Sequence, residues 1–480
     1  MITIIQVLGS LRSYKVANFK FINEKEPIPA PLSSIALYKY YTEIKKIEKS
    51  SIKLIYYVPE SLIVDYINLS EINDLANNYQ NALKKFKEQY TQGLTNLIGS
   101  EISFETKIIH SIGVYYSRNF NYTITFNNYI ENIISQFLLD LLDINDQLVV
   151  DISTGFNFYT QALNEVTRNL LVYNKLKNIL QNNFKLKIQC SIVPPIISPQ
   201  PSWTYPITFL EVRAKVFFEF PYQNLNSFEK FFSVKEFPTE NNTEKGEIGK
   251  QLPQIKNKDK NEIIYPVLTA INAIKHNCPL AFFTKEIIKF DKNQNLLNFQ
   301  LGNLKNLMSL TEQFINFEVN DNNIIIYRLK VKKTNLVNYL FTIALHQSLK
   351  NFYLSEIDSK PPEISNIEKI FETLYSNLNL GTNKRFLARD LKFIKIMGEK
   401  LDKGEEKQLN LLKSSEGLIP KNRIEDDKNF SDQKRNFFAH SGLLSDFIKL
   451  KKGKTNDEKL EINYIEKNIK LIKSWIENPE

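Results

Sequence analysis

The chain has 480 residues, of which 42% are hydrophobic and 24% are charged. This length and composition allow two or three folded domains and exclude disorder of the whole chain. The 62 Lys and Arg residues exceed the 53 Asp and Glu residues, so the formal net charge is +9. Such an excess favours an anionic partner, nucleic acid first, although a lysine-rich codon bias explains it equally well.

The two cysteines, Cys190 and Cys278, are far apart in apolar surroundings, so they provide neither a disulfide framework nor a cysteine zinc site. Residues 2–8 are apolar, but no basic region precedes them and no cleavage site follows them. No apolar stretch approaches the roughly 18 residues of a membrane span. We therefore expect a cytoplasmic protein that has no membrane partner.

Short apolar runs that stop at turn-forming residues characterise the first part of the chain, and they predict the buried strands of a parallel sheet. The runs cover residues 2–8, 53–58, 147–152 and 185–193. Between them, apolar residues repeat at helical spacing from Phe126 to Leu142. We therefore predict an N-terminal α/β, Rossmann-like domain over residues 1–222, which ends in strand-like residues 207–220.

Charged and polar residues dominate the next segment, residues 223–262, where we expect a linker or a small insertion. Helical periodicity prevails after it, and residues 314–331 predict a hairpin. The expected helices cover residues 263–276, 336–352 and 364–380 and begin again at Phe437. Residues 263–480 are therefore predicted to form a mainly α-helical domain.

Several common catalytic motifs are missing from the sequence. The four histidines show no His-Glu-x-x-His run and no pair at i, i+4 spacing, so a histidine metal site is not expected. Neither a Gly-x-Gly-x-x-Gly fingerprint nor a Gly-Lys-Ser/Thr phosphate loop occurs, and a Gly-x-Ser-x-Gly elbow is also missing. Dinucleotide oxidoreductases, P-loop NTPases and the usual serine hydrolases are therefore disfavoured.

The strongest candidate for chemistry is the run from Arg435 to His440, which we expect near the start of a helix capped by Ser431. Asn436 directly follows the arginine, and Gly442 comes shortly after the histidine. This spacing is only weakly specific, because a helix-capping histidine beside a solvated arginine gives the same pattern. The candidate catalytic residues are Arg435, Asn436 and His440.

Arg and His in this arrangement suit RNA transesterification, in which the ribose 2′-hydroxyl attacks the adjacent phosphorus. His440 can transfer protons near neutral pH, and Arg435 can stabilise the charge that develops on the phosphorane, so no metal or cofactor is expected. On an ideal helix these two residues point about 140° apart, whereas Asn436 and His440 share a face. We therefore expect two copies of the chain to pool their groups in a homodimer or a higher oligomer of dimers.

A second candidate site follows the run that ends at residue 152. Small hydroxyl and glycine residues there precede a helix, and in open α/β sheets ligands bind at the carboxyl ends of the strands. Residues 9–12 follow the first strand and add the positive charge of Arg12. An ordinary helix cap is the structural alternative. The candidate ligand-binding residues are Gly9, Ser10, Leu11, Arg12, Ser153, Thr154, Gly155 and Asn157.

Both candidate sites resemble motifs of one known family. Residues 7–10, Val-Leu-Gly-Ser, and residues 151–157, Asp-x-Ser-Thr-Gly-x-Asn, are similar to the CARF domain of CRISPR-associated proteins. Residues 435–442, Arg-Asn-x-x-x-His-x-Gly, resemble the HEPN ribonuclease motif, and residues 270–281 resemble the opening of that family's HEPN domain. The two resemblances cover both ends of the chain in the family's order.

This resemblance implies a ribonuclease of type III CRISPR systems that cuts single-stranded RNA when cyclic oligoadenylate binds its CARF dimer. The activator we expect is cyclic tetra-adenylate. One departure is Thr154, at a position where the family often has histidine, and it leaves the ring size and any cleavage of the ring open.

Two rival functions remain at this stage. One is a non-enzymatic, nucleotide-sensing regulator that binds DNA, which would be expected to show a clear recognition helix. The other is a stand-alone HEPN toxin that cuts tRNA, which would not need the N-terminal domain.

Overall fold

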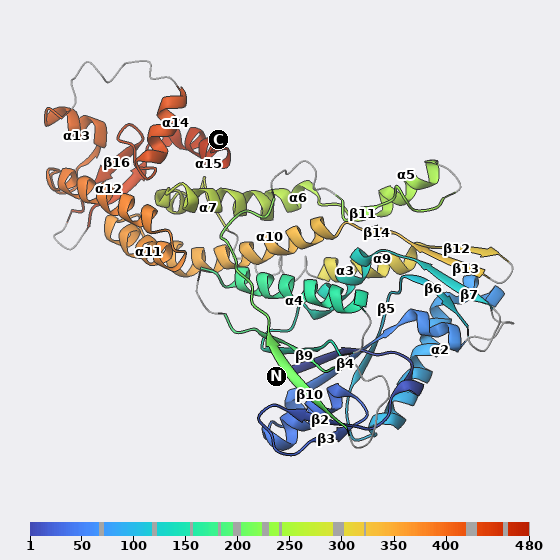
Figure 1. The fold of residues 1–480 in the computed structure, drawn as a ribbon. Helices are drawn as coiled ribbons and strands as arrows, with labels where there is room; N and C mark the ends of the chain where they lie inside the picture. Colours follow the sequence, from blue (N-terminus) through green and yellow to red (C-terminus); the bar gives the residue numbers. More distant parts are fainter. Residues whose placement is uncertain are drawn as a thin grey trace.

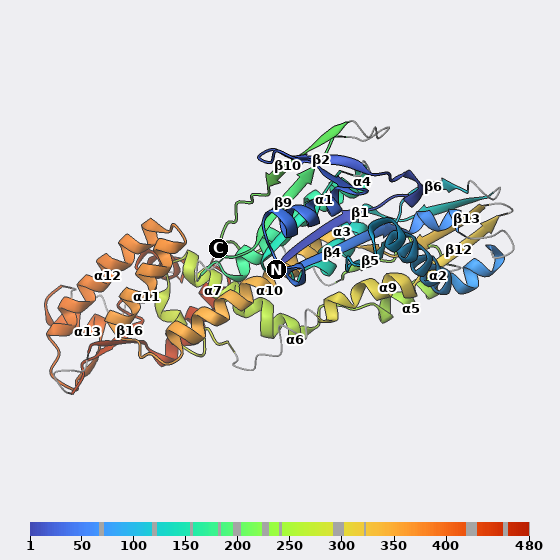
Figure 2. The same cartoon turned by 90° about the horizontal axis from the view of Figure 1, so that it is seen from below.

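The computed structural model describes residues 1–66, 72–117, 122–153, 157–180, 184–194, 203–222, 230–239, 242–290, 302–320, 323–418, 430–454 and 459–479. These residues form an elongated molecule with an α/β lobe at one end and a smaller, mainly helical lobe at the other (Figure 1). The view from below shows the same separation of the two lobes (Figure 2).

The α/β lobe is built on an eight-stranded sheet in the order β3-β2-β10-β9-β8-β1-β4-β5. Its strands are β1 (Ile2–Val7), β2 (Ala17–Phe21), β3 (Ile28–Ala30), β4 (Ile52–Pro59), β5 (Glu105–Ile109), β8 (Gln147–Asp151), β9 (Lys187–Ile192) and β10 (Thr204–Glu211). The strands β9, β8, β1, β4 and β5 are parallel to one another, and β10 is antiparallel to β9. The predicted Rossmann-like α/β fold is therefore confirmed, and the strands predicted at residues 2–8, 53–58, 147–152 and 185–193 begin and end within two residues of those limits. The strand-like segment predicted over residues 207–220 is wrong beyond residue 211, because β10 ends there and residues 212–220 form no strand.

Helices cover both faces of this sheet because the central strands bury side chains on both sides. Ile5 and Val7 of β1 belong to the hydrophobic core shared with α3 and α4, whereas Ile4 belongs to the core shared with α1 and α2. These helices are α1 (Ser33–Lys39), α2 (Ile72–Ile98), α3 (Ile130–Leu141) and α4 (Asn157–Lys177).

A second sheet joins distant parts of the chain in the order β12-β13-β7-β6. Its strands are β6 (Gly113–Tyr116), β7 (Thr123–Asn127), β12 (Ile315–Asn320) and β13 (Asn323–Arg328), and α9 (Leu307–Gln313) precedes β12. The predicted hairpin is thus present, but β13 pairs with β7, so the hairpin belongs to the α/β lobe. Phe126 lies in β7 and not in the predicted helix, which begins at Ile130.

The described part of residues 223–262 is packed against the rest of the molecule. It contains β11 (Phe232–Ser233), α5 (Asn242–Gln251) and α6 (Asn257–Asp259), and β11 pairs with β14 (Lys330–Val331). Phe232, Ile248 and Leu252 are buried in the same core as α3 and α4. These contacts make the described part of this segment an ordered insertion.

A stack of helices connects the two lobes. α10 (Lys333–Phe352) contacts α4 on one side and α7 (Tyr265–Lys275) on the other, and α7 contacts α15 (Ile469–Glu477) of the helical lobe. Figure 1 shows these helices as successive layers between the sheet and the C-terminal end of the chain. One continuous hydrophobic core runs through the stack, so the lobes are mechanically linked.

The C-terminal lobe is mainly helical, as predicted, but it also contains a small sheet. Its elements are α11 (Ile364–Asn377), α12 (Gly381–Glu399), α13 (Leu409–Ser415), α14 (Phe430–Ala439), α15 and the strands β15 (Glu406–Gln408), β16 (Ile448–Lys451) and β17 (Glu461–Tyr464). The helix predicted from Phe437 onward is wrong, because α14 ends at Ala439 and two strands come before α15. None of the described helices is both long and apolar enough to cross a membrane.

Candidate functional site

His440 lies at the end of α14, where the helix is closed by a left-handed turn. The Gly442 amide donates to the carbonyl of Phe437 at 2.9 Å, and the Ser441 amide donates to that of Phe438 at 3.3 Å. Ser441 and Gly442 both have positive φ, 54° and 68°, as in a Schellman-type cap. The histidine is therefore at the C-terminus of the helix, not near its start as predicted. Ser431 lies inside α14 and does not cap it.

Phe437 anchors this helix end in the core. Its side chain is completely buried, with ring centroids 5.5 Å from Trp475 and 6.0 Å from Phe447. Because Phe437 points inward, Arg435 and His440 are left on the outside of α14, and both are exposed. The aromatic residues between the arginine and the histidine thus have a structural role.

Gly442 packs closely against Cys278, just after α7, and leaves little room for a side chain. A Cβ atom there would lie 3.1 Å from the Cα, Cβ and Sγ atoms of Cys278, and the positive φ already disfavours side chains. Cys278 directly follows the loop after α7, so this contact joins the motif to residues 270–281. Burial raises the pKa of the Cys278 thiol, which makes it a packing residue and not a nucleophile.

A buried polar network holds the turn that follows His440. The Ser441 hydroxyl donates to Asp390 Oδ2 at 2.7 Å and accepts from Asn277 Nδ2 at 2.9 Å. Arg389 donates to Asp390 Oδ1 from Nε at 3.0 Å and from Nη2 at 2.9 Å. The Asn277 Nδ2 atom also lies 3.1 Å from the carbonyl oxygen of Asn383. The network ties α7, α12 and α14 together, and it fixes the backbone that carries the histidine.

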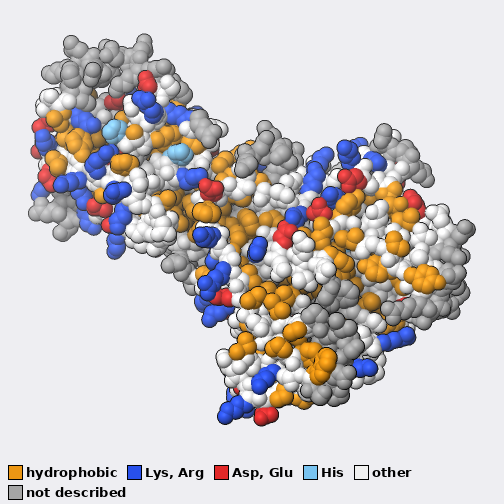
Figure 3. All heavy atoms as spheres, viewed as in Figure 1, with side chains coloured by type: hydrophobic (Ala, Val, Ile, Leu, Met, Phe, Trp, Pro, Cys, Tyr) orange, Lys and Arg blue, Asp and Glu red, His pale blue; other side chains and the backbone are white. Residues whose placement is uncertain are grey.

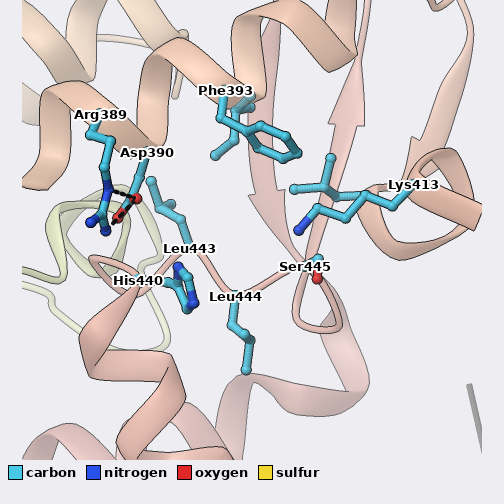
Figure 4. A pocket seen from close by; sticks show the side chains of 10 residues that line it. Arg389, Asp390, Phe393, Lys413, His440, Leu443, Leu444 and Ser445 are labelled. Carbon is cyan, nitrogen blue, oxygen red and sulfur yellow. Dashed lines mark hydrogen bonds and ion pairs between the residues drawn. The ribbon is translucent and has the colours of Figure 1, made fainter. Parts of the chain in front are cut away.

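A pocket of about 380 Å³ opens beside His440. It is lined by Arg389, Asp390, Phe393, Ile394, Leu409, Lys413, His440, Leu443, Leu444 and Ser445. Figure 4 shows the His440 ring near the ion pair of Arg389 and Asp390, with Phe393 and Lys413 on the far side. The sequence analysis singled out only His440 among these residues: Arg389, Asp390, Phe393, Ile394, Leu409 and Lys413 come from distant parts of the chain, and Leu443, Leu444 and Ser445 follow the motif without a signal of their own.

Arg435 and Asn436 do not line this pocket. The Arg435 side chain is 80% exposed, with Nη2 4.0 Å from Asp432 Oδ1. Asn436 is half-buried, and its carbonyl accepts the His440 amide at 3.1 Å. Within one chain, therefore, both side chains are exposed, but only His440 lies at the pocket. Figure 3 shows Lys and Arg side chains spread over this lobe, with histidine side chains among them at the surface.

The second candidate site lies at the carboxyl edge of the main sheet. β1 and β8 are parallel neighbours with Gln6 opposite Asp151, so residues 9–12 and Ser153 leave the sheet side by side. Asn157 is the first residue of α4 and is exposed, as is Arg12. Thr154 and Gly155 lie outside the described residues.

Asp151, at the end of β8, fixes this edge through hydrogen bonds to Ser33 and Ser153. Its side chain is fully buried and accepts hydrogen bonds from the hydroxyls of Ser33 and Ser153 and from the Ser153 amide, the last at 3.0 Å. Burial raises the pKa of Asp151, although these hydrogen bonds oppose the shift. The aspartate therefore holds the start of the loop and is not available to a ligand.

The backbone amide and carbonyl of Gly9 both form hydrogen bonds with tyrosine hydroxyls. The Gly9 amide donates to the Tyr14 hydroxyl at 2.8 Å, and its carbonyl accepts from the Tyr90 hydroxyl at 2.6 Å. Burial raises the pKa of Tyr14 to about 12, so this hydroxyl stays protonated. The polar side chains that this loop offers to a ligand are those of Ser10 and Arg12. Among the described residues, no group of three or more His, Cys, Asp or Glu is arranged to hold a metal ion.

Family comparisons identify both lobes. Residues 3–194 match the model described as the CARF domain of the CRISPR system endoribonuclease Csx1, and residues 362–467 match the model of its HEPN domain. Residues 270–281 lie outside both matches. No curated protein shows a significant match to the chain.

The fold and these matches define a class of protein in which a ligand-sensing domain and a ribonuclease domain share one chain. The chain belongs to the CRISPR-associated CARF-HEPN proteins. The first match covers the main sheet except β10, together with the candidate ligand-binding edge, and the second covers α11 to β17, including the pocket beside His440.

Proposed function

We propose that the protein is an endoribonuclease of type III CRISPR antiviral defence that cuts single-stranded RNA when a cyclic oligoadenylate, most simply cyclic tetra-adenylate, binds its CARF domain. The observation that carries this proposal is the position of His440, exposed at a pocket of the HEPN domain on a helix end that a buried network holds in place. The same chain carries a sheet edge of the kind that binds phosphate ligands.

The proposed reaction needs no external nucleophile. The ribose 2′-oxygen attacks the adjacent phosphorus and loses its proton to His440, and the bond from phosphorus to the 5′-oxygen breaks as that oxygen gains a proton. Arg435 stabilises the negative charge of the phosphorane. The products are a 2′,3′-cyclic phosphate and a 5′-hydroxyl. Because Arg435 supplies the positive charge that a cation would otherwise provide, the proposed reaction needs no metal ion.

We further propose that the active enzyme is a homodimer. Arg435 is 80% exposed and does not line the pocket of its own chain, so a single copy presents an incomplete set of groups. A two-fold arrangement of two HEPN domains would let the arginine of one copy and the histidine of the other act on the same phosphate.

The activator is proposed to bind at the carboxyl edge of the main sheet. Arg12 supplies a cation there, and Ser10, Ser153 and Asn157 supply hydrogen-bonding groups for phosphate or adenine. A ring of several nucleotides would span the edges of two copies. Its binding would reach the HEPN domain through the stack of α4, α10 and α7.

The direct test is incubation of labelled single-stranded RNA with the intact chain and a panel of cyclic oligoadenylates of different ring sizes. We expect cleavage with one ring size and little without a ring, and no cleavage of single-stranded DNA. Equal cleavage with and without every ring would contradict the sensor, and no cleavage of RNA under any condition would contradict the enzyme.

A further inference from the structure

The pocket beside His440 contains an aromatic residue and a lysine that the proposed proton transfer by His440 does not require. Phe393, on α12, is 38% exposed although its ring forms part of the wall. Lys413 Nζ, from α13, lies 4.8 Å from the centroid of this ring. Leu443 and Leu444 supply further apolar surface near the imidazole (Figure 4). An exposed aromatic ring beside a cation is the usual arrangement for stacking a nucleic-acid base and holding its phosphate.

The outer face of α12 continues this pattern toward its N-terminus. Phe386 is 47% exposed, with the Arg389 guanidinium 5.1 Å from its ring centroid. Arg385 and Lys392 on the same helix are also exposed. The single acidic residue among those that line the described pocket, Asp390, is paired with Arg389 and accepts the Ser441 hydroxyl. The exposed side of α12 and the adjoining pocket therefore combine positive charge with aromatic surface, so that a single ligand could contact both.

We propose that this pocket is a nucleotide subsite, in which Phe393 stacks the base next to the scissile phosphate and Lys413 binds the phosphate beyond it. This inference rests on the proposed RNA cleavage and assigns a residue that would hold the substrate in register with His440. A volume of about 380 Å³ is within the usual range for small-ligand sites, which suits one nucleotide.

RNA fits this face better than a second copy of the chain does. Two copies of α12 facing each other would bring Arg385, Arg389 and Lys392 against their own counterparts, and like charges across an interface are unfavourable. A polyanion with exposed bases instead complements both the charges and the rings.

The test uses saturating activator and two RNA substrates that differ only in the base beside the cut, one of them abasic at that nucleotide. With the normal RNA, Phe393→Ala should raise KM about 10-fold and change kcat little, since base stacking is lost but the chemical groups remain. With the abasic RNA, wild type and Phe393→Ala should have the same KM. Phe393→Tyr should restore most of the affinity for normal RNA, because the ring is kept.

Phe184→Ala is the matched control, because Phe184 is also 38% exposed, with Lys175 Nζ 5.4 Å from its ring centroid, but lies in the α/β lobe and does not line the pocket. It should leave KM within about twofold of wild type. Lys413→Gln should raise KM and reduce its dependence on salt, as expected for a phosphate contact.

The outcomes separate this inference from the proposed function. If wild type cuts RNA but Phe393→Ala has an unchanged KM, or loses affinity equally for normal and abasic RNA, the subsite is wrong while the enzyme stands. If Phe393→Ala sediments as a smaller species than wild type, the ring belongs to an interface between copies and the subsite is also wrong. If wild type cuts no RNA, the proposed function fails, and RNA binding by the same variants still decides the subsite.

Discussion

His440 and Arg435 are the residues on which the proposed chemistry depends, and each can be tested alone. His440→Ala and Arg435→Ala should each lower the cleavage rate by about 10²- to 10⁴-fold, because one removes proton transfer and the other removes stabilisation of the phosphorane. Steady-state cleavage of labelled RNA at saturating activator measures the effect. Both side chains are exposed, so the melting temperature and activator binding should not change. A well-folded His440→Ala protein with full activity would favour the non-enzymatic regulator.

We also expect RNA cleavage by His440 and Arg435 to need no metal ion. RNA cleavage should continue in excess EDTA and should leave 2′,3′-cyclic phosphate and 5′-hydroxyl ends, which mass spectrometry can identify. A 2′-deoxy sugar at the cut site should block the reaction, because the nucleophile is missing. Activity that is lost in EDTA, or products with 3′-hydroxyl and 5′-phosphate ends, would mean that water attacks with the help of a metal.

The end of α14 depends on the conformation of Gly442. Gly442→Ala should destabilise the protein by about 1–3 kcal/mol, because alanine pays for the positive φ and its Cβ meets Cys278. Urea denaturation followed by circular dichroism measures this loss. Gly246→Ala in α5 is the control, since its Cβ would meet nothing within 4 Å and helical alanine is favourable. A neutral Gly442→Ala variant would show that the turn after His440 is not held tightly.

α10 contains a buried histidine that makes the stability of the protein depend on pH. Burial, with a contribution from the charge of Lys350, lowers the pKa of His346 to about 4, although the backbone of Glu262 partly opposes this shift. A histidine with a depressed folded-state pKa contributes stability that is complete above its unfolded value of about 6.5 and is lost as pH falls toward 4. From pH 7 to pH 5 the loss should be about 2 kcal/mol.

His346→Gln isolates this contribution. The stability of wild type relative to His346→Gln should fall by about 2 kcal/mol between pH 7 and pH 5, because glutamine does not titrate. Urea denaturation of both proteins at the two pH values gives the difference. A constant difference would show that His346 has an ordinary pKa in the folded protein.

The sequence predicts a helix or strand correctly where local residue patterns determine it, and incorrectly where pairing with a distant segment determines it. Residues 2–8 form an apolar run that stops at glycine, and β1 has nearly those limits. Phe126 fits the helical spacing of its neighbours, but pairing with β13, about 200 residues away, makes it part of a strand. The helix predicted from Phe437 onward overlooked the turn at Ser441 and Gly442, which have positive φ, and the strands β16 and β17 follow only from their pairing.

The residues of the candidate site likewise fall into those that the sequence indicates and those that only the tertiary structure reveals. The motif from Arg435 to His440 is contiguous in sequence, so pattern alone singles it out. Asp390 and Asn277, which hold the turn after His440, come from α12 and from the loop after α7, and no local signal connects them to the motif. A buried network of this kind requires the tertiary structure before its members can be named.

In the intact molecule, activation by a ring at the carboxyl edge of the main sheet requires a signal to pass from that edge to the HEPN domain. Arg12→Ala should shift the activation curve to about 10- to 100-fold higher activator concentration, because a charge-assisted contact to the ring is lost, and it should leave the plateau rate unchanged. RNA cleavage across a titration of cyclic tetra-adenylate measures both quantities. Lys187→Ala is the control, since Lys187 is exposed at the opposite, amino end of β9. Identical curves for Arg12→Ala and wild type would place the ring elsewhere.

Ring-activated, metal-independent cleavage can be measured in one experiment: the initial rate of single-stranded RNA cleavage by the intact wild-type chain as cyclic tetra-adenylate is added in the presence of EDTA. We predict a rate close to zero without the ring and a saturable rise to a plateau with it. A rate that stays the same at every concentration of this ring and of the other cyclic oligoadenylates would contradict a ring-activated ribonuclease.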